Sequence, residues 1–177
     1  MISPVRLAHI VFRTHDLPRL RDWYCRVLGA HVVNGNDKIA FLTYDEEHHR
    51  VALIAAPQLA ERPAEPTTGF YHAAFTYAGL EELLATYDRL KAEGIEPWRL
   101  INHGPTISFY YRDPDGNDIE FQVDRFADAL DAQEWMKGEA FTRNPIGIDI
   151  DVEELRRRMQ SGEPVASIMR RSDEVAA

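Results

Sequence analysis

The chain of 177 residues carries one pattern twice, and this internal duplication limits its fold more than any other feature. The segment AHIVFRT, which contains His9, aligns with the segment YHAAFTY, which contains His72. Each segment has the alternation of a strand, is followed by an amphipathic helix that ends at a glycine, and leads into three short strand candidates. A β-α-β-β-β order that occurs twice predicts two related half-modules that share one cleft.

We therefore predict an α+β fold in which paired βαβββ modules form an open barrel around a metal cleft. The modules span residues 5–56 and 70–125 of a domain that covers residues 1–125. Between them, the proline-containing segment 57–69 is expected to be a linker. Equivalent positions on two related first strands can face one another, because a strand sends every second side chain to the same side.

The rest of the chain, residues 126–177, departs from the repeat and predicts a helical C-terminal extension. Its last residues, from Arg171 onward, are expected to be frayed. The composition of the extension is compatible with three roles: packing over the barrel, covering the pocket, or forming an oligomer contact.

Charge and cysteine content narrow the class of protein. A formal net charge of -9 repels phosphate backbones, so no nucleic-acid partner is expected. No apolar run approaches the roughly 20 residues of a membrane span, so no membrane partner is expected either. The single cysteine, Cys25, excludes an internal disulfide and indicates a cytoplasmic protein. We also expect the chain to form a homo-oligomer.

Two histidines stand at the same coordinate of the repeat, His9 and His72, on segments otherwise rich in apolar residues. A single histidine of this kind is more often a core or cleft residue whose nitrogens are hydrogen-bonded. The recurrence at one repeat coordinate favours a shared role instead, because a packing accident has no reason to recur there.

A carboxylate completes the candidate site. Glu120 lies between Ile119 and Phe121 on the strand that follows the turn DPDG, and its burial without a partner would cost several kcal/mol. A solvent-facing glutamate is the simple alternative. Two imidazoles and one carboxylate from separate strands make the facial triad of non-haem Fe(II) oxygenases, and the same ligands suit Mn(II).

A fourth protein ligand is missing from the first module. When the last strands of the two modules are aligned, Ala52 or Leu53 falls near the coordinate of Glu120, and neither side chain can bind a metal. A site with four protein ligands, as in a lactoylglutathione lyase, is therefore incomplete. Three protein ligands favour a metal that must also bind two substrate oxygens and dioxygen.

The stretch INHGPTISFYYRDPDGNDIE, residues 101–120, resembles the motif of the type I extradiol ring-cleavage dioxygenases of the vicinal-oxygen-chelate superfamily. The stretch EEHHRVALIAAP is similar to that family's His-His segment. The resemblance covers residues 5–125. Since the chain has one pair of modules, it resembles the one-domain, biphenyl-2,3-diol 1,2-dioxygenase-like members. The motif positions that match are His103, Phe109, Tyr110, Asp113, Pro114, Gly116 and Glu120.

The resemblance implies an Fe(II)-dependent enzyme that cleaves the ring of a catechol-type aromatic diol with O2. It implies that the metal ligands are His9, His72 and Glu120. A lyase or isomerase that uses the same ligands on the same fold is one alternative. A metal-free protein that binds an aromatic drug, of the bleomycin-resistance type, is another, although such proteins lack the ligand triad.

The resemblance also implies three catalytic residues. His49 is the acid–base histidine, Tyr110 hydrogen-bonds a catecholate oxygen, and His103 lines the pocket. Each has a plainer interpretation. His48 and His49 follow three acidic residues and fit an exposed charged turn; Tyr110 fits ordinary strand packing, and His103 fits a turn before Gly-Pro.

Overall fold

The protein is described by a computed structural model that covers residues 1–60, 62–63, 65 and 67–174. Three positions of the expected linker, residues 61, 64 and 66, and the expected frayed end at 175–177 lie outside these described residues. The chain divides into two compact units, each of which is described by itself. Unit 1 comprises Met1–Phe70 and Asp113–Asn117, and unit 2 comprises Tyr71–Arg112 and Asp118–Ala177.

Unit 1 is a four-stranded mixed sheet, in the order β1-β4-β3-β2, with helix α1 against β3 and β4. Asp16 caps α1 by accepting a hydrogen bond from the Arg19 amide, and Gly29 ends it with φ 64°. The end of this helix at a glycine was expected from the sequence and is confirmed. The elements are β1 (Ile10–Thr14), α1 (Leu17–Leu28), β2 (His31–Gly35), β3 (Ile39–Thr43) and β4 (Val51–Ala55).

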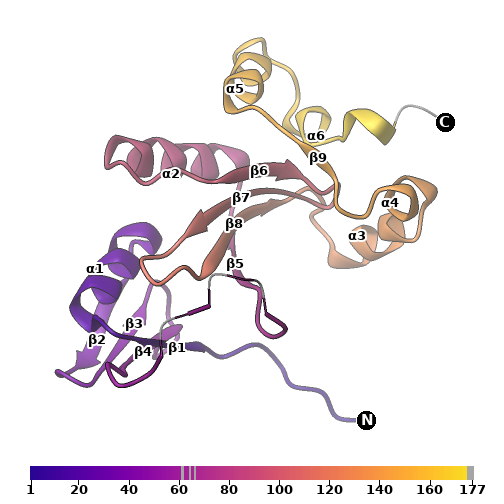
Figure 1. Ribbon diagram of the computed structural model, residues 1–177. Coiled ribbons are helices and arrows are strands. Elements are labelled where there is room, and N and C mark those ends of the chain that lie inside the picture. Colours follow the sequence, from indigo (N-terminus) through magenta and orange to yellow (C-terminus); the bar gives the residue numbers. More distant parts are fainter. Residues whose placement is uncertain (61, 64, 66, 175–177) are drawn as a thin grey trace. The chain divides into compact units, whose positions relative to one another are not determined.

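Unit 2 repeats this arrangement with the strand order β5-β8-β7-β6, and a short strand β9 extends it beyond β6. Helix α2 covers one face of this sheet (Figure 1). On that face Tyr87 packs against Phe109 at 5.8 Å between ring centroids. The elements are β5 (His72–Tyr77), α2 (Leu80–Ala92), β6 (Arg99–Asn102), β7 (Thr106–Arg112), β8 (Asp118–Asp124) and β9 (Ile148–Asp149).

The expected duplication is confirmed in an α+β fold with two mixed sheets. In both units the first and last strands of the module run parallel, and the other neighbours are antiparallel. Apolar residues on the helix-covered faces form the core of each unit. Fully buried examples are Leu20, Tyr24, Leu42 and Leu53 in unit 1, and Leu83, Phe109, Tyr111 and Phe121 in unit 2.

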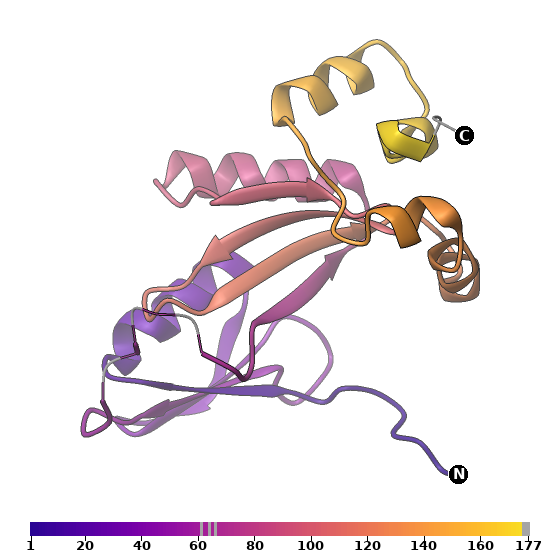
Figure 2. The same ribbon diagram turned by 45° about the vertical axis from the view of Figure 1, so that its right-hand side comes forward.

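The C-terminal extension is helical and belongs to unit 2, as Figure 2 shows for the segments that follow β8. The expectation that the chain is frayed from Arg171 onward is wrong for Arg171, whose side chain is completely buried. A 3-10 helix, η1 (Ser172–Glu174), follows it. The other elements of the extension are α3 (Ala129–Met136), α4 (Glu139–Arg143), α5 (Val152–Gln160) and α6 (Val165–Ile168).

Among the helices in the described part of the chain, none is both long enough and apolar enough to cross a membrane.

Candidate functional site

The candidate site in unit 2 lies on the sheet face that α2 does not cover. Tyr110 on β7 is paired in register with Glu120 on β8, and Ala74 on β5 is the other neighbour of Glu120. Phe109, which packs against α2, points to the opposite face because successive side chains alternate along a strand. His72 lies two residues before Ala74 on β5, so it shares the face of Glu120.

Four of the predicted residues come together on this face. The His72 Nε2 atom lies 2.9 Å from Glu120 Oε2, and the Tyr110 hydroxyl lies 2.9 Å from His103 Nε2. His103 Nε2 also lies 3.9 Å from Glu120 Oε1, which links the two pairs. Glu120 is only 5% exposed, so the alternative of a solvent-facing glutamate is wrong.

The His72–Glu120 pair has the donor atoms that a divalent cation requires. An imidazole nitrogen and a buried carboxylate oxygen suit iron or manganese. The second ring nitrogen of His72, Nδ1, is buried and has no hydrogen-bond partner among the described residues. A buried polar atom without a partner costs about 1–3 kcal/mol, which structures tolerate mainly at functional sites.

Burial shapes the protonation of the two other groups. It raises the pKa of the Tyr110 hydroxyl well above its ordinary value, and the negative charge of Glu120 adds to the increase. It lowers the pKa of His103, although the carbonyl of Ile146 and the charge of Glu120 oppose this decrease. Burial therefore favours the uncharged form of both groups.

Unit 1 supplies the two remaining predicted histidines. His9 lies one residue before β1 and is exposed, whereas the sequence predicted it within the strand. His49, in the loop between β3 and β4, is half-buried and contacts the rings of His9 and Phe41 at centroid distances of 4.3 and 5.1 Å. The simple picture of an exposed turn holds for His48 but not for His49.

Strand register identifies what the first module has in place of Glu120. Ile10 pairs with Val51 in unit 1 as Ala73 pairs with Ile119 in unit 2, so Ala52 is the counterpart of Glu120. Of the two positions that the sequence left open, the structure therefore selects Ala52. Its neighbour on β3 is Phe41, which is by the same logic the counterpart of Tyr110. Only the second module carries the carboxylate and the hydroxyl.

The complete set of three metal ligands remains a prediction. His72 and Glu120 lie together within unit 2, whereas His9 belongs to unit 1. Over the residues that the structure describes, no group of three or more His, Cys, Asp or Glu side chains gathers as a metal site would require. The pair in unit 2 is thus the part of the predicted site that the structure supports.

One contact in the site was missed in the sequence. The Nδ1 atom of His103 lies 2.5 Å from the carbonyl oxygen of Ile146, which is part of the C-terminal extension. Every residue type has a main-chain carbonyl, so no pattern in the sequence predicts this contact.

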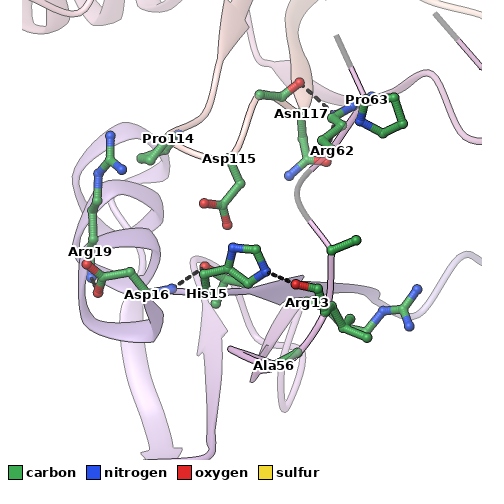
Figure 3. Close-up of a pocket in the computed structure, with 14 residues that line it drawn as sticks. Arg13, His15, Asp16, Arg19, Ala56, Arg62, Pro63, Pro114, Asp115 and Asn117 are labelled. Carbon is green, nitrogen blue, oxygen red and sulfur yellow. Dashed lines mark hydrogen bonds between the residues drawn. The ribbon is translucent and has the colours of Figure 1, made fainter. Parts of the chain in front are cut away.

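A cavity of about 660 Å³ opens in unit 1 beside Thr14, the last residue of β1. His9 lies just before the first residue of this strand. Three arginines and two aspartates are among its lining residues, and the Asp115 carboxylate points toward the His15 ring (Figure 3). None of the predicted site residues lines this cavity. Its charged lining differs from the aromatic surroundings that would suit a flat hydrocarbon ring.

Comparison with known proteins identifies the superfamily that the sequence motif resembles. The model of the Glyoxalase/Bleomycin resistance protein/Dioxygenase superfamily matches residues 6–121. Biphenyl-2,3-diol 1,2-dioxygenase 2 of Rhodococcus globerulus is 42% identical over 95% of this chain and 88% of its own length. Biphenyl-2,3-diol 1,2-dioxygenase 3 of the same organism is 45% identical over 94% of this chain and 88% of its own length.

These two alignments extend over nearly the whole chain. Because they leave out only about one residue in twenty of this chain, they include most of the C-terminal extension. The crystal structure of a lactoylglutathione lyase from Agrobacterium tumefaciens superposes with a TM-score of 0.56 at 19% identity. It covers 69% of this chain and 96% of the lyase, and at this identity the likeness concerns the fold alone.

Proposed function

Because the chain belongs to the Glyoxalase/Bleomycin resistance protein/Dioxygenase superfamily, we propose that it is an Fe(II)-dependent extradiol dioxygenase. Its substrate would be a catechol-type aromatic such as biphenyl-2,3-diol, the diol in the names of the two Rhodococcus relatives, with O2 as the second substrate. The His72–Glu120 pair, whose carboxylate is buried, carries the proposal, because it lies beside Tyr110 and His103 and joins metal donors to hydrogen-bonding groups on one face.

The residues that we propose as metal ligands are His9, His72 and Glu120, with Mn(II) as an alternative to Fe(II). When bound, the metal would supply Lewis acidity for both catechol oxygens and a coordination position for O2. The support for His72 and Glu120 is their contact in unit 2 and the burial of Glu120. His9 is supported by its place in the repeat, where it is the counterpart of His72.

The proposed roles of the other residues follow from their contacts. Tyr110 would hydrogen-bond a catecholate oxygen. Because its one proton is donated to His103, the Tyr110 oxygen would accept from the catechol hydroxyl that keeps its proton. The uncharged His103 would line the pocket and accept the hydrogen bond from Tyr110. His49 would move protons to and from the reacting oxygens; its support is its ring contact with His9 and its partial burial against Phe41.

Oxygen uptake tests the proposal. Chain reconstituted with Fe(II) without air is mixed with biphenyl-2,3-diol and with catechol, and O2 consumption is followed with the growth of a yellow ring-opened product. His72→Gln should abolish both signals. His31→Gln, which changes an exposed histidine at the start of β2, is the matched control and should keep them. Turnover of other substrates without O2 consumption would favour a lyase or isomerase, and metal-independent ligand binding would favour a drug-binding protein.

We also propose residues 1–125 as the metal-binding domain and residues 126–177 as its extension. A cytoplasmic location is supported by the single cysteine, Cys25. The net charge of -9 supports the absence of a nucleic-acid partner, and we propose no membrane partner. A homo-oligomer is the remaining proposal. Light scattering of the purified chain would measure its mass against the 20.3 kDa of one copy.

A further inference from the structure

The C-terminal extension encloses the turn that carries His103. This turn joins β6 to β7, and strand β9 of the extension pairs with β6 through Asn102 and Ile148. The buried side-chain amide of Asn102 also donates to the carbonyl of Met169 at 3.0 Å. Two distant parts of the extension therefore hold the residue that immediately precedes His103.

Two glycines allow this close approach. Gly104 has φ 103°, and a Cβ atom added to it would lie 1.9 Å from the Trp135 ring on α3. Gly147 also has φ 103°, and an added Cβ atom would lie 2.2 Å from the carbonyl oxygen of Asn102. Any other residue would meet both steric overlap and an unfavourable backbone conformation at these positions. The turn and the extension are thus in direct contact on two sides of His103.

The buried side chain of Arg171 also links this turn to the extension. Its guanidinium group is completely buried, stacks near the Trp135 ring at 5.8 Å, and forms an ion pair with Asp173. An arginine has five N–H donors, and all five are used here. The acceptors are both carboxylate oxygens of Asp173 and the carbonyl oxygens of His103, Asn144 and Ala140.

The extension also contacts the His103 ring itself. A carbonyl oxygen can only accept a hydrogen bond, so Nδ1 of His103, 2.5 Å from the carbonyl of Ile146, must carry the proton. In the uncharged ring Nε2 is then an acceptor, and it faces the Tyr110 hydroxyl at 2.9 Å. The choice between the two tautomers of a histidine is set by the hydrogen bond of its other nitrogen.

We infer that the C-terminal extension is a positioning element for the proposed site. It fixes His103 as the Nδ1–H tautomer through Ile146, and Arg171 acts as a positioning residue that holds the turn. Tyr110 is thereby obliged to donate to His103, which orients its hydroxyl. This inference deepens the proposed function, because His103 and Tyr110 are residues of the proposed catechol pocket. It also gives the extension a role that its composition did not indicate.

Nitrogen NMR of the histidine rings tests the inference. The full-length chain, labelled with 15N at histidine and loaded with diamagnetic Zn(II), should show His103 protonated at Nδ1 and unprotonated at Nε2. His103→Asn identifies the signal. In Arg171→Gln we expect mixed tautomers at His103. The matched control is Arg158→Gln, because Arg158 donates only within the extension, to Glu163 and to the carbonyls of Ser167 and Ile168.

Kinetics of the Fe(II)-loaded chain with biphenyl-2,3-diol give the second readout. Arg171→Gln should lower kcat about tenfold while KM changes less than about threefold, since small misplacements of a reacting group cost rate more than binding. Arg158→Gln should keep both constants. If Arg171→Gln does not fold, Arg171→Lys replaces it, because lysine keeps the charge but offers only three donors without the planar fork.

Three results would overturn the inference: a native His103 protonated at Nε2, an Arg171 variant with the native tautomer and kcat, or equal effects of the Arg158 and Arg171 variants. The tautomer measurement needs no turnover. Absence of catechol cleavage would therefore refute the proposed function, while the NMR result would still decide whether the extension positions His103.

Discussion

Replacement of Tyr110 by phenylalanine removes one hydroxyl from the centre of the proposed site and leaves the ring in place. The ring packs edge-on against His72 at 5.5 Å and against Trp98 at 5.8 Å, and phenylalanine keeps both contacts. What is lost is the hydrogen bond that the hydroxyl donates to His103. The variant therefore isolates the contribution of the hydroxyl.

The magnitude follows from that bond. A neutral hydrogen bond contributes about 0.5–1.5 kcal/mol to stability, and Tyr110→Phe should lose this amount. For a chain of this size, that loss lowers Tm by roughly 1–6 °C. If the hydroxyl also binds a catecholate oxygen, loss of about 1.5–3 kcal/mol in the transition state lowers kcat/KM about 10-fold to 150-fold.

Tyr111 is the matched control in the next position of the same strand. Its ring is buried in the core at 1% exposure, but its hydroxyl has no hydrogen-bond partner among the described residues. Removal of a buried unpaired hydroxyl is neutral or stabilising. Tyr111→Phe should therefore keep the native kcat/KM and unfold at the native temperature or above it.

Calorimetry and oxygen uptake on both variants measure these effects. Equal Tm values for Tyr110→Phe and Tyr111→Phe would show that the Tyr110 hydroxyl makes no stabilising hydrogen bonds. A native kcat/KM in Tyr110→Phe, with its Tm lowered, would refute the substrate contact and leave the structural one.

Three further outcomes are expected. Tyr24→Phe removes the hydroxyl that donates to the buried Asp113 carboxylate, 3.1 Å away, and should lower the free energy of unfolding in urea by about 1.5–3 kcal/mol; an unchanged midpoint would contradict this. Arg158 and Ser167 lower the pKa of Glu163 from 4.5 to about 2, so their stabilisation is complete above pH 4.5 and is lost as the pH falls toward 2. The Tm difference between the native chain and Glu163→Gln should accordingly shrink over that range, and a constant difference would argue against the ion pair. Chelation of the metal should stop O2 uptake with catechol and Fe(II) should restore it, whereas activity that survives metal removal would exclude the proposed iron site.

The sequence alone determined the local elements and the repeat. Periodicity, the Asp16 cap and the Gly29 stop define α1, because these signals act within a few residues of one another. The alignment of His9 with His72 predicted the duplication, and the two strand orders confirm it. Glu120 was found because a carboxylate between two apolar residues is an anomaly within its own strand.

Only the tertiary structure decided how distant segments meet. Strand register, which a shift of one residue would change, selects Ala52 as the counterpart of Glu120. The burial of Arg171 depends on carbonyl oxygens up to 68 residues away, and the tautomer of His103 depends on the carbonyl of Ile146. Main-chain carbonyls are the same in every residue, so contacts made through them are decided when the chain folds and leave no pattern in the sequence.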